Sequence, residues 1–204
     1  MRKGEITRNH IIDKAARLMN QRGFTSTSLA EIVEITGLQK GGIYNHFKDK
    51  EEIILLAFDQ CCSIMRERIE SELQSKTTAK DQLFAFIEAY YSFGDHSPLA
   101  GGCTIMNAGV EADDGRSPRL LEQVQQQMRI LLLLIEDIVK NGIENKEFRA
   151  EVDPHEAATF IMSSIEGGIL LRQIFAEESH VLTVKKHLKL YILHELSAEL
   201  GSMD

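Results

Sequence analysis

The chain has 204 residues, of which 43% are hydrophobic and 26% are charged, with a formal net charge of −8 at pH 7. This is the composition of an ordinary globular protein of one or two domains, and its longest aliphatic run, Ile130–Ile135, is far shorter than the about 18 residues of a membrane span. Three cysteines, two of them adjacent, and an N-terminus without an apolar signal core favour the cytoplasm over export.

Every periodic segment of the chain is predicted to be helical, and no stretch has the strict alternation of a strand. The first helix is expected to begin with Thr7 as its N-cap and to end at Gly23. Ser28 and Glu31 have the spacing of a capping box at the start of the second helix. In chain order, the nine helices are expected over residues 7–22, 28–36, 39–47, 49–73, 79–93, 103–113, 118–141, 154–175 and 181–200.

Charge is divided unevenly along the chain. Residues 1–50 carry nine basic and five acidic side chains, a net +4, whereas residues 51–204 carry a net −12. A basic end on an acidic protein favours a polyanionic partner at that end.

Residues 27–50 have the pattern of a helix-turn-helix, two short helices joined by a turn of three to four residues that contains glycine. Gly41 and Gly42 lie inside the second of these helices, where each costs about 1 kcal/mol relative to alanine. A sequence tolerates this cost where a side chain would keep a partner away from the backbone. Ile43 and Phe47, four residues apart, are expected to face the core. The alternative is a helical hairpin with a polar exposed face.

The residues in and next to this segment that match one family are Gly23-Phe24, Thr27-Ser28-Leu29, Ile32, Gly37-Leu38, Lys40-Gly41, Ile43-Tyr44, His46-Phe47 and Lys50-Glu51. Among them, Tyr44, His46 and Phe47 followed by Lys50 are close to diagnostic. On these residues the segment resembles the DNA-binding domain of TetR-family transcriptional repressors. The match covers about residues 7–55, and the rest of the chain agrees in helix count and lengths. Gly42 stands where many family members carry Ser, Thr or Ala.

The resemblance implies an all-α fold of about nine helices, with an N-terminal three-helix helix-turn-helix domain followed by a larger helical bundle. Residues 1–50 would bind DNA, and residues 51–204 would bind a ligand and dimerise. The function would be that of a sequence-specific transcriptional regulator, a homodimeric repressor that binds a palindromic operator and is released by a small-molecule effector. Catalytic residues, a cofactor, a metal ion and a membrane are not expected.

The third helix would then lie in the major groove of DNA. Gln39 and Lys40 are the expected base contacts, because Gln suits adenine and Lys suits guanine. Phosphate contacts are expected from side chains and from the N-terminus of the fourth helix near Lys50. For His46 the alternative is a buried histidine. The expected DNA-binding residues are Thr27, Gln39, Lys40, Gly41, Gly42, Tyr44, Asn45, His46, Lys48 and Lys50.

The last two helices would form the dimer contact, and the middle helices an effector pocket that is mostly apolar, with a few polar groups. In both cases the alternative is that the residues belong to the core of the single chain. The expected dimer residues are Ile161, Ile165, Gly168, Ile169, Leu188, Tyr191 and Ile192. The expected pocket residues are Met65, Phe86, Tyr90, Phe93, Cys103, Met106, Asn107, Glu111, Val124 and Met128.

Two other functions are open at this point. Cys103 is expected to begin a helix, whose dipole favours a reactive thiolate, and Gly101-Gly102 is expected to leave it accessible. A repressor that senses oxidants or electrophiles through Cys103 is therefore one alternative. The other is a non-specific architectural DNA-binding protein, which the net charge of −8 disfavours.

Overall fold

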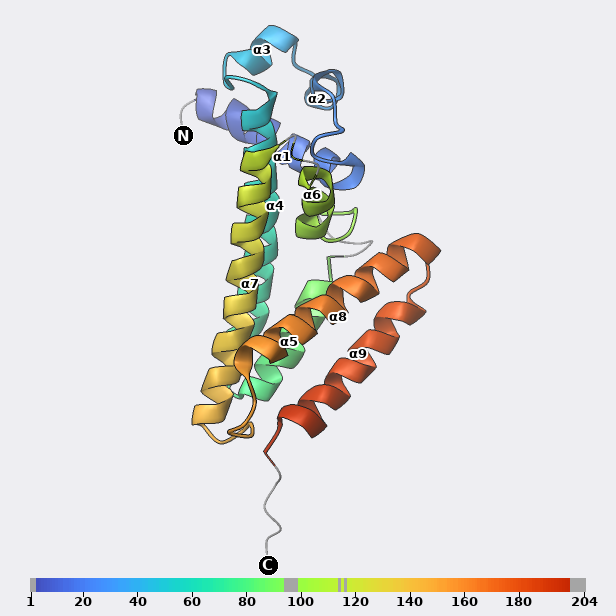
Figure 1. Cartoon of the computed structure of the whole chain (residues 1–204). Helices are drawn as coiled ribbons and strands as arrows, with labels where there is room; N and C mark the ends of the chain where they lie inside the picture. Colours follow the sequence, from blue (N-terminus) through green and yellow to red (C-terminus); the bar gives the residue numbers. More distant parts are fainter. Residues whose placement is uncertain (1–2, 94–98, 114, 116, 199–204) are drawn as a thin grey trace, which may run out of the picture. The chain divides into compact units, whose positions relative to one another are not determined.

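The computed structural model describes residues 3–93, 99–113, 115 and 117–198, and these residues contain nine α-helices and no β-strand (Figure 1). The predicted all-α fold is confirmed. The helices are α1 (Lys3–Arg22), α2 (Leu29–Thr36), α3 (Lys40–Tyr44), α4 (Lys50–Leu73), α5 (Ala79–Tyr91), α6 (Thr104–Ala112), α7 (Pro118–Glu144), α8 (Pro154–Phe175) and α9 (Ser179–Tyr191). A π-helical turn, Ile192–Leu196, continues α9.

Helix boundaries differ from the predictions by three residues or more at four ends, one of which is the end of α7, at Glu144 instead of residue 141. Helix α1 begins at Lys3, so Thr7 lies inside it and its hydroxyl donates a hydrogen bond to the Lys3 carbonyl (3.2 Å) instead of capping the helix. Helix α3 ends at Tyr44 rather than near Phe47, because the chain turns there. Helix α9 ends at Tyr191, before the π-helical turn.

The chain divides into two compact units. Unit 1 comprises residues 1–66 and 93–127, and unit 2 comprises residues 67–92 and 128–204. The boundary between the units cuts α4 and α7, so each of these helices has one part in unit 1 and the other in unit 2. The division of function at residue 50 stays a prediction, because the units describe packing rather than binding.

Unit 1 contains α1, α2, α3 and α6 around an aromatic and aliphatic core. Phe24 and Phe58 pack edge to face, with ring centroids 5.6 Å apart, and Ile11, Ile32 and Ile43 are fully buried. Burial of such side chains removes apolar surface from water and is the main source of stability for these short helices.

Unit 2 contains α5, α8 and α9, and α8 and α9 lie side by side as a hairpin (Figure 1). The predicted start of α8 is confirmed: Asp153 accepts hydrogen bonds from the backbone N–H groups of His155 and Glu156, and Pro154 occupies the first turn. Within the described residues, no helix is both long enough and apolar enough to cross a bilayer.

Candidate nucleic-acid interface

Helices α2 and α3 form the predicted helix-turn-helix. Ser28 caps α2, and its capping box with Glu31 is complete in both directions. Hydrogen bonds from Ser28, together with Arg22 at 2.8 Å, lower the pKa of Glu31 to about 2, so this carboxylate stays ionised. Gly37 ends α2 in the left-handed region (φ 67°), which favours glycine. Three residues, 37–39, then lead into α3.

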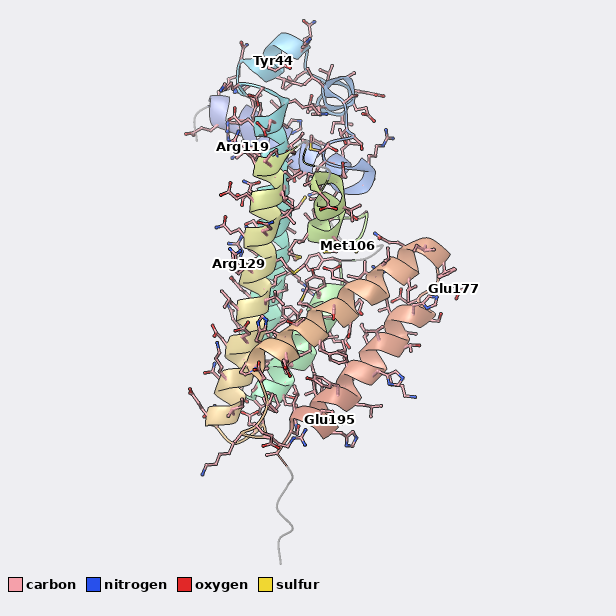
Figure 2. All side chains as sticks on the ribbon, in the orientation of Figure 1. Tyr44, Met106, Arg119, Arg129, Glu177 and Glu195 are labelled. Atoms are coloured by element: carbon pink, nitrogen blue, oxygen red, sulfur yellow. The ribbon has the colours of Figure 1, made fainter. Side chains whose placement is uncertain are left out.

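Helix α3 has one apolar and one polar face. Ile43 and Phe47 are buried, as predicted, at 0% and 3% exposure. The opposite face carries Lys40 and Tyr44, whose ring is 41% exposed although it is large and aromatic (Figure 2). The Lys40 Nζ lies 6.0 Å from the centroid of the Tyr44 ring. This face therefore presents a cation and a phenol to the surroundings.

Five other expected DNA-binding residues also reach the surface of this segment. Gln39 is exposed and its side chain makes no capping hydrogen bond to α3, so its amide is directed elsewhere. The remaining four are Asn45 and Lys48, both exposed, and Gly42 and His46, both half-buried. The alternative of a fully buried His46 is therefore wrong.

The two glycines of α3 are not required by packing inside the chain. A Cβ on Gly41 would meet no atom within 4 Å, and one on Gly42 would meet only the Leu38 Cβ at 3.9 Å, an ordinary contact. Both positions could carry alanine, which would stabilise the helix by about 1 kcal/mol each. Their backbone is instead left open to a close approach from outside.

The predicted phosphate contact of Thr27 is wrong. Thr27 is 1% exposed, and its hydroxyl donates to the Gly23 carbonyl at 2.6 Å. The turn that brings the chain from α1 to α2 folds back on itself here, so this hydroxyl closes the turn and does not reach the surface.

The N-terminus of α4 also differs from the prediction. The half-buried Lys50 donates from Nζ to the Thr25 carbonyl at 2.9 Å, so it braces the chain internally. Asp49 accepts from the Glu52 N–H, and Glu52 in turn accepts from the Lys48 N–H, both at 2.8 Å. The Asp49 carboxylate therefore takes one of the N–H groups in the first turn of α4, where a phosphate was expected.

The expected effector-pocket residues divide between the two units. Most are buried in the described structure: Met65, Phe86, Tyr90, Phe93, Cys103 and Val124, with Met106 and Met128 half-buried. Asn107 and Glu111 are hydrogen-bonded to the C-terminal end of α1 and the turn that follows it. The pocket, with these two residues, stays a prediction.

Cys103 is not accessible, contrary to the prediction. It is 3% exposed, and its sulfur caps α6 by accepting a hydrogen bond from the Met106 N–H (3.4 Å). Cys61 and Cys62 are buried too, and burial raises the pKa of the Cys61 thiol to about 12. Across the described residues there is no cluster of His, Cys, Asp and Glu that could hold a metal ion.

Six of the seven expected dimer residues belong to the core of the single chain, as the alternative proposed, and the seventh, Tyr191, is half-buried. Ile161, Ile165 and Ile192 are 0% exposed, Ile169 and Leu188 are nearly so, and Tyr191 packs its ring 4.6 Å from that of Phe160. A Cβ on Gly168 would lie 2.6 Å from the Tyr91 hydroxyl, so this glycine serves packing within the unit.

A different set of apolar side chains on α8 and α9 is exposed. Its members are Phe160, Leu170, Leu171, Ile174, Phe175, Leu182, Leu190 and Leu193, each between 38% and 62% exposed. On α8, residues 160, 164, 167, 171 and 174 follow the spacing of one helical face. Gly167 lies on this face, with nothing within 4 Å of where its Cβ would be. We call these exposed side chains and Gly167 the outer face of α8–α9.

Two family models match the chain: "Bacterial regulatory proteins, tetR family" over residues 11–57, and "Tetracyclin repressor-like, C-terminal domain" over residues 79–188. The chain is 30% identical to the HTH-type transcriptional regulator AcrR of Shigella flexneri, over 93% of this chain and 87% of that protein. A TetR transcriptional regulator from Chloroflexus aurantiacus is 36% identical, with a TM-score of 0.92 over 97% of this chain and 99% of that one. A TetR-family regulator from Cytophaga hutchinsonii is 28% identical, with a TM-score of 0.90 over 98% of both chains.

Proposed function

Since the chain belongs to the TetR family and is a DNA-binding transcriptional regulator, we propose that it is a homodimeric repressor that reads a palindromic operator through α3 and is released by a small-molecule effector. The observation that carries this proposal is the polar face of α3. It combines exposed Gln39, Lys40 and Tyr44 with two glycines that no internal contact requires.

Each group on α3 has a chemistry that suits a part of the duplex. Gln39 and Lys40 begin the helix, and in a helix-turn-helix the first residues of the second helix contact base edges. Lys suits the O6 and N7 acceptors of guanine, and Gln suits adenine. The Tyr44 hydroxyl, Asn45, His46 and Lys48 would contact phosphates, which fix the orientation of the protein without reading sequence.

The outer face of α8–α9 supports a dimer. Eight exposed leucine, isoleucine and phenylalanine side chains lie on this helix hairpin and the turn that continues it, and a large exposed apolar area is typical of an interaction surface. Gly167 would let the backbone of a second copy come close. A two-fold dimer would place two α3 helices on successive major grooves, with half-sites about 34 Å apart or a multiple of that distance.

The effector proposal rests on the family and on the buried aromatic side chains of α5. Phe86 and Tyr90 lie with ring centroids 5.8 Å apart, an environment that suits an apolar or aromatic molecule. Release of DNA requires that the effector bind a DNA-incompetent arrangement more tightly than the competent one, because only differential affinity shifts populations.

Selection of bound duplexes from random DNA tests this function. The full chain should recover a palindromic motif with two half-sites, and anisotropy titrations should show tighter binding to that motif than to a scrambled duplex. A bound pool with no shared motif would contradict the proposal and would favour the architectural alternative.

A further inference from the structure

We infer that Glu111 of α6 is a positioning residue for DNA binding: its carboxylate holds the turn between α1 and α2, residues 23–26, in the conformation that places the helix-turn-helix. The inference rests on the proposed function, because it concerns how α3 is presented to the operator. It adds to the DNA-binding machinery a residue that lies about sixty positions beyond the helix-turn-helix in sequence.

The Glu111 carboxylate is surrounded by donors from one turn of chain. Its Oε1 accepts from the Phe24 N–H at 2.7 Å, and its Oε2 accepts from the Thr25 N–H at 2.8 Å and the Thr25 hydroxyl at 2.7 Å. The N–H and hydroxyl of Ser26 lie 3.3 and 3.4 Å from Oε2. Hydrogen bonds to an ionised acceptor are roughly twice as strong as neutral ones, so this one side chain fixes three successive residues.

Gly23 is shaped to admit this carboxylate. It has a φ of 105°, in the left-handed region, and a Cβ there would lie 2.9 Å from both Glu111 oxygens. Any side chain at this position would therefore meet both backbone strain and a collision. The Glu111 carboxylate can therefore bind the turn only because residue 23 is glycine.

The opposite side of the turn is held by Lys50. Its Nζ donates to the Thr25 carbonyl at 2.9 Å, while Glu111 accepts from the N–H of the same residue. The Lys50 ammonium group and the Glu111 carboxylate thus bind the carbonyl and the N–H of Thr25. Ser28, three residues later, caps α2, and α2 packs against α3, so a displacement of the turn would be passed to α3.

Other polar contacts keep α6 in place against α1. The Asn20 side chain, 2% exposed, donates to the Ala100 carbonyl at 3.0 Å and accepts from the Thr104 hydroxyl at 2.7 Å. Asn107 donates to the Asn20 carbonyl at 3.2 Å. Buried amides satisfied in this way specify one register, because a shifted α6 would leave them unpaired. Glu111 therefore contacts the turn from a helix whose position against α1 is fixed.

A positioning role predicts more than a loss of stability. If the turn is released, each helix-turn-helix of the dimer samples several orientations, and the distance between the two α3 helices is no longer fixed. The protein should then bind the operator more weakly and should discriminate less between operators whose half-sites are one base pair closer or farther apart.

The test uses the full-length protein with Glu111→Gln, which keeps the shape of the side chain and removes its charge, and with Glu122→Gln as a matched control at an exposed position of α7. We expect E111Q to bind the selected operator about 10–100-fold more weakly, the effect of losing charged hydrogen bonds. We also expect its affinities for operators altered by one base pair in spacing to come within about twofold of its affinity for the parent operator. E122Q should match the wild type in both respects.

Thr25→Val provides a second variant, because it removes only the hydroxyl donor to Glu111. It should show a smaller loss of affinity and of spacing preference, and the double variant should lose less than the two single losses multiplied. If E111Q does not fold, T25V decides the question by itself. Wild-type affinity and spacing preference in the folded E111Q or in T25V would overturn the positioning role. Lys40→Ala serves as the reference for the proposed function: if it also binds like the wild type, the assignment of α3 fails as well.

Discussion

Lys40 and Tyr44 lie one turn apart on the exposed face of α3, and their chemistries assign them different tasks. A lysine at the start of the helix can donate to a guanine edge, which carries sequence information. The Tyr44 hydroxyl can donate to a phosphate oxygen, which does not. The two residues are therefore expected to respond differently to a change of DNA sequence.

Substitution of each residue tests this division. Tyr44→Phe keeps the ring and should weaken binding to operator and to random DNA by the same factor, about tenfold for one hydrogen bond to a charged group. Lys40→Ala should weaken operator binding more than random binding. Anisotropy titrations on both duplexes measure the two ratios, and equal losses on both duplexes for both variants would refute the assignment.

The three cysteines should be unreactive in the folded protein. All three are buried, and burial raises the pKa of Cys61 and Cys62 because it disfavours the thiolate. Labelling with an aromatic disulfide reagent should therefore be slow in buffer and should reach three thiols only in denaturant. Fast labelling of Cys103 in buffer, absent from Cys103→Ser, would restore the redox-sensing alternative.

Single residues also show where sequence patterns reach their limit. The Ser28 cap and the Asp153-Pro154 start are local signals, and both were predictable because their partners lie within three residues. The contact between Glu111 and the Phe24 N–H was not predictable, because the two residues are 87 positions apart. Helical periodicity carries no information about a contact at that separation. The family resemblance predicts a phosphate contact for Thr27, but its hydroxyl donates to the Gly23 carbonyl and is buried.

At the scale of elements, α3 is short and contains two glycines, so its own stability is low. Gly41→Ala places a methyl group in open space and should raise the free energy of unfolding by about 0.5–1 kcal/mol. The same methyl group should keep the backbone away from DNA and weaken operator binding. Urea unfolding and anisotropy on one preparation measure both effects. A stabilised variant with unchanged affinity would show that α3 does not approach DNA at this position.

Helix α8 explains why the dimer residues were misassigned. It carries apolar residues on both faces, so periodicity identifies two candidate faces and does not say which one is covered by α9 and the rest of unit 2. The structure places Ile161, Ile165 and Ile169 inward. Phe160, Gly167 and Leu170 are left on the other side, and each lies one position away from a residue of the predicted stripe.

At the scale of the whole molecule, the charge asymmetry agrees with the proposed division of tasks. The +4 of residues 1–50 includes the polar face of α3, while residues 51–204 carry −12, which disfavours contact with a polyanion. Affinity should therefore depend on few phosphate contacts per subunit and on the presence of two subunits at once.

The proposed dimer can be disrupted without disturbing the core. Ile174 is 62% exposed on the outer face of α8–α9, so Ile174→Glu should leave the fold intact. It should raise the dissociation constant of the dimer about 100-fold or more, because two symmetry-related copies each lose about 1.5–3 kcal/mol of burial and gain a charge. Sedimentation at micromolar concentration should show monomers, whereas Gln125→Glu on α7 should remain dimeric. A dimer of wild-type strength for I174E would exclude this interface.

The central claim is that α3 reads bases in two symmetric half-sites. Selection from random DNA, carried out in parallel with the wild type and with Lys40→Ala, tests it most directly. We predict a palindrome for the wild type and, for K40A, the same palindrome with a degenerate position at the same place in each half-site. A motif that is equally well defined at every position for both proteins would contradict the account.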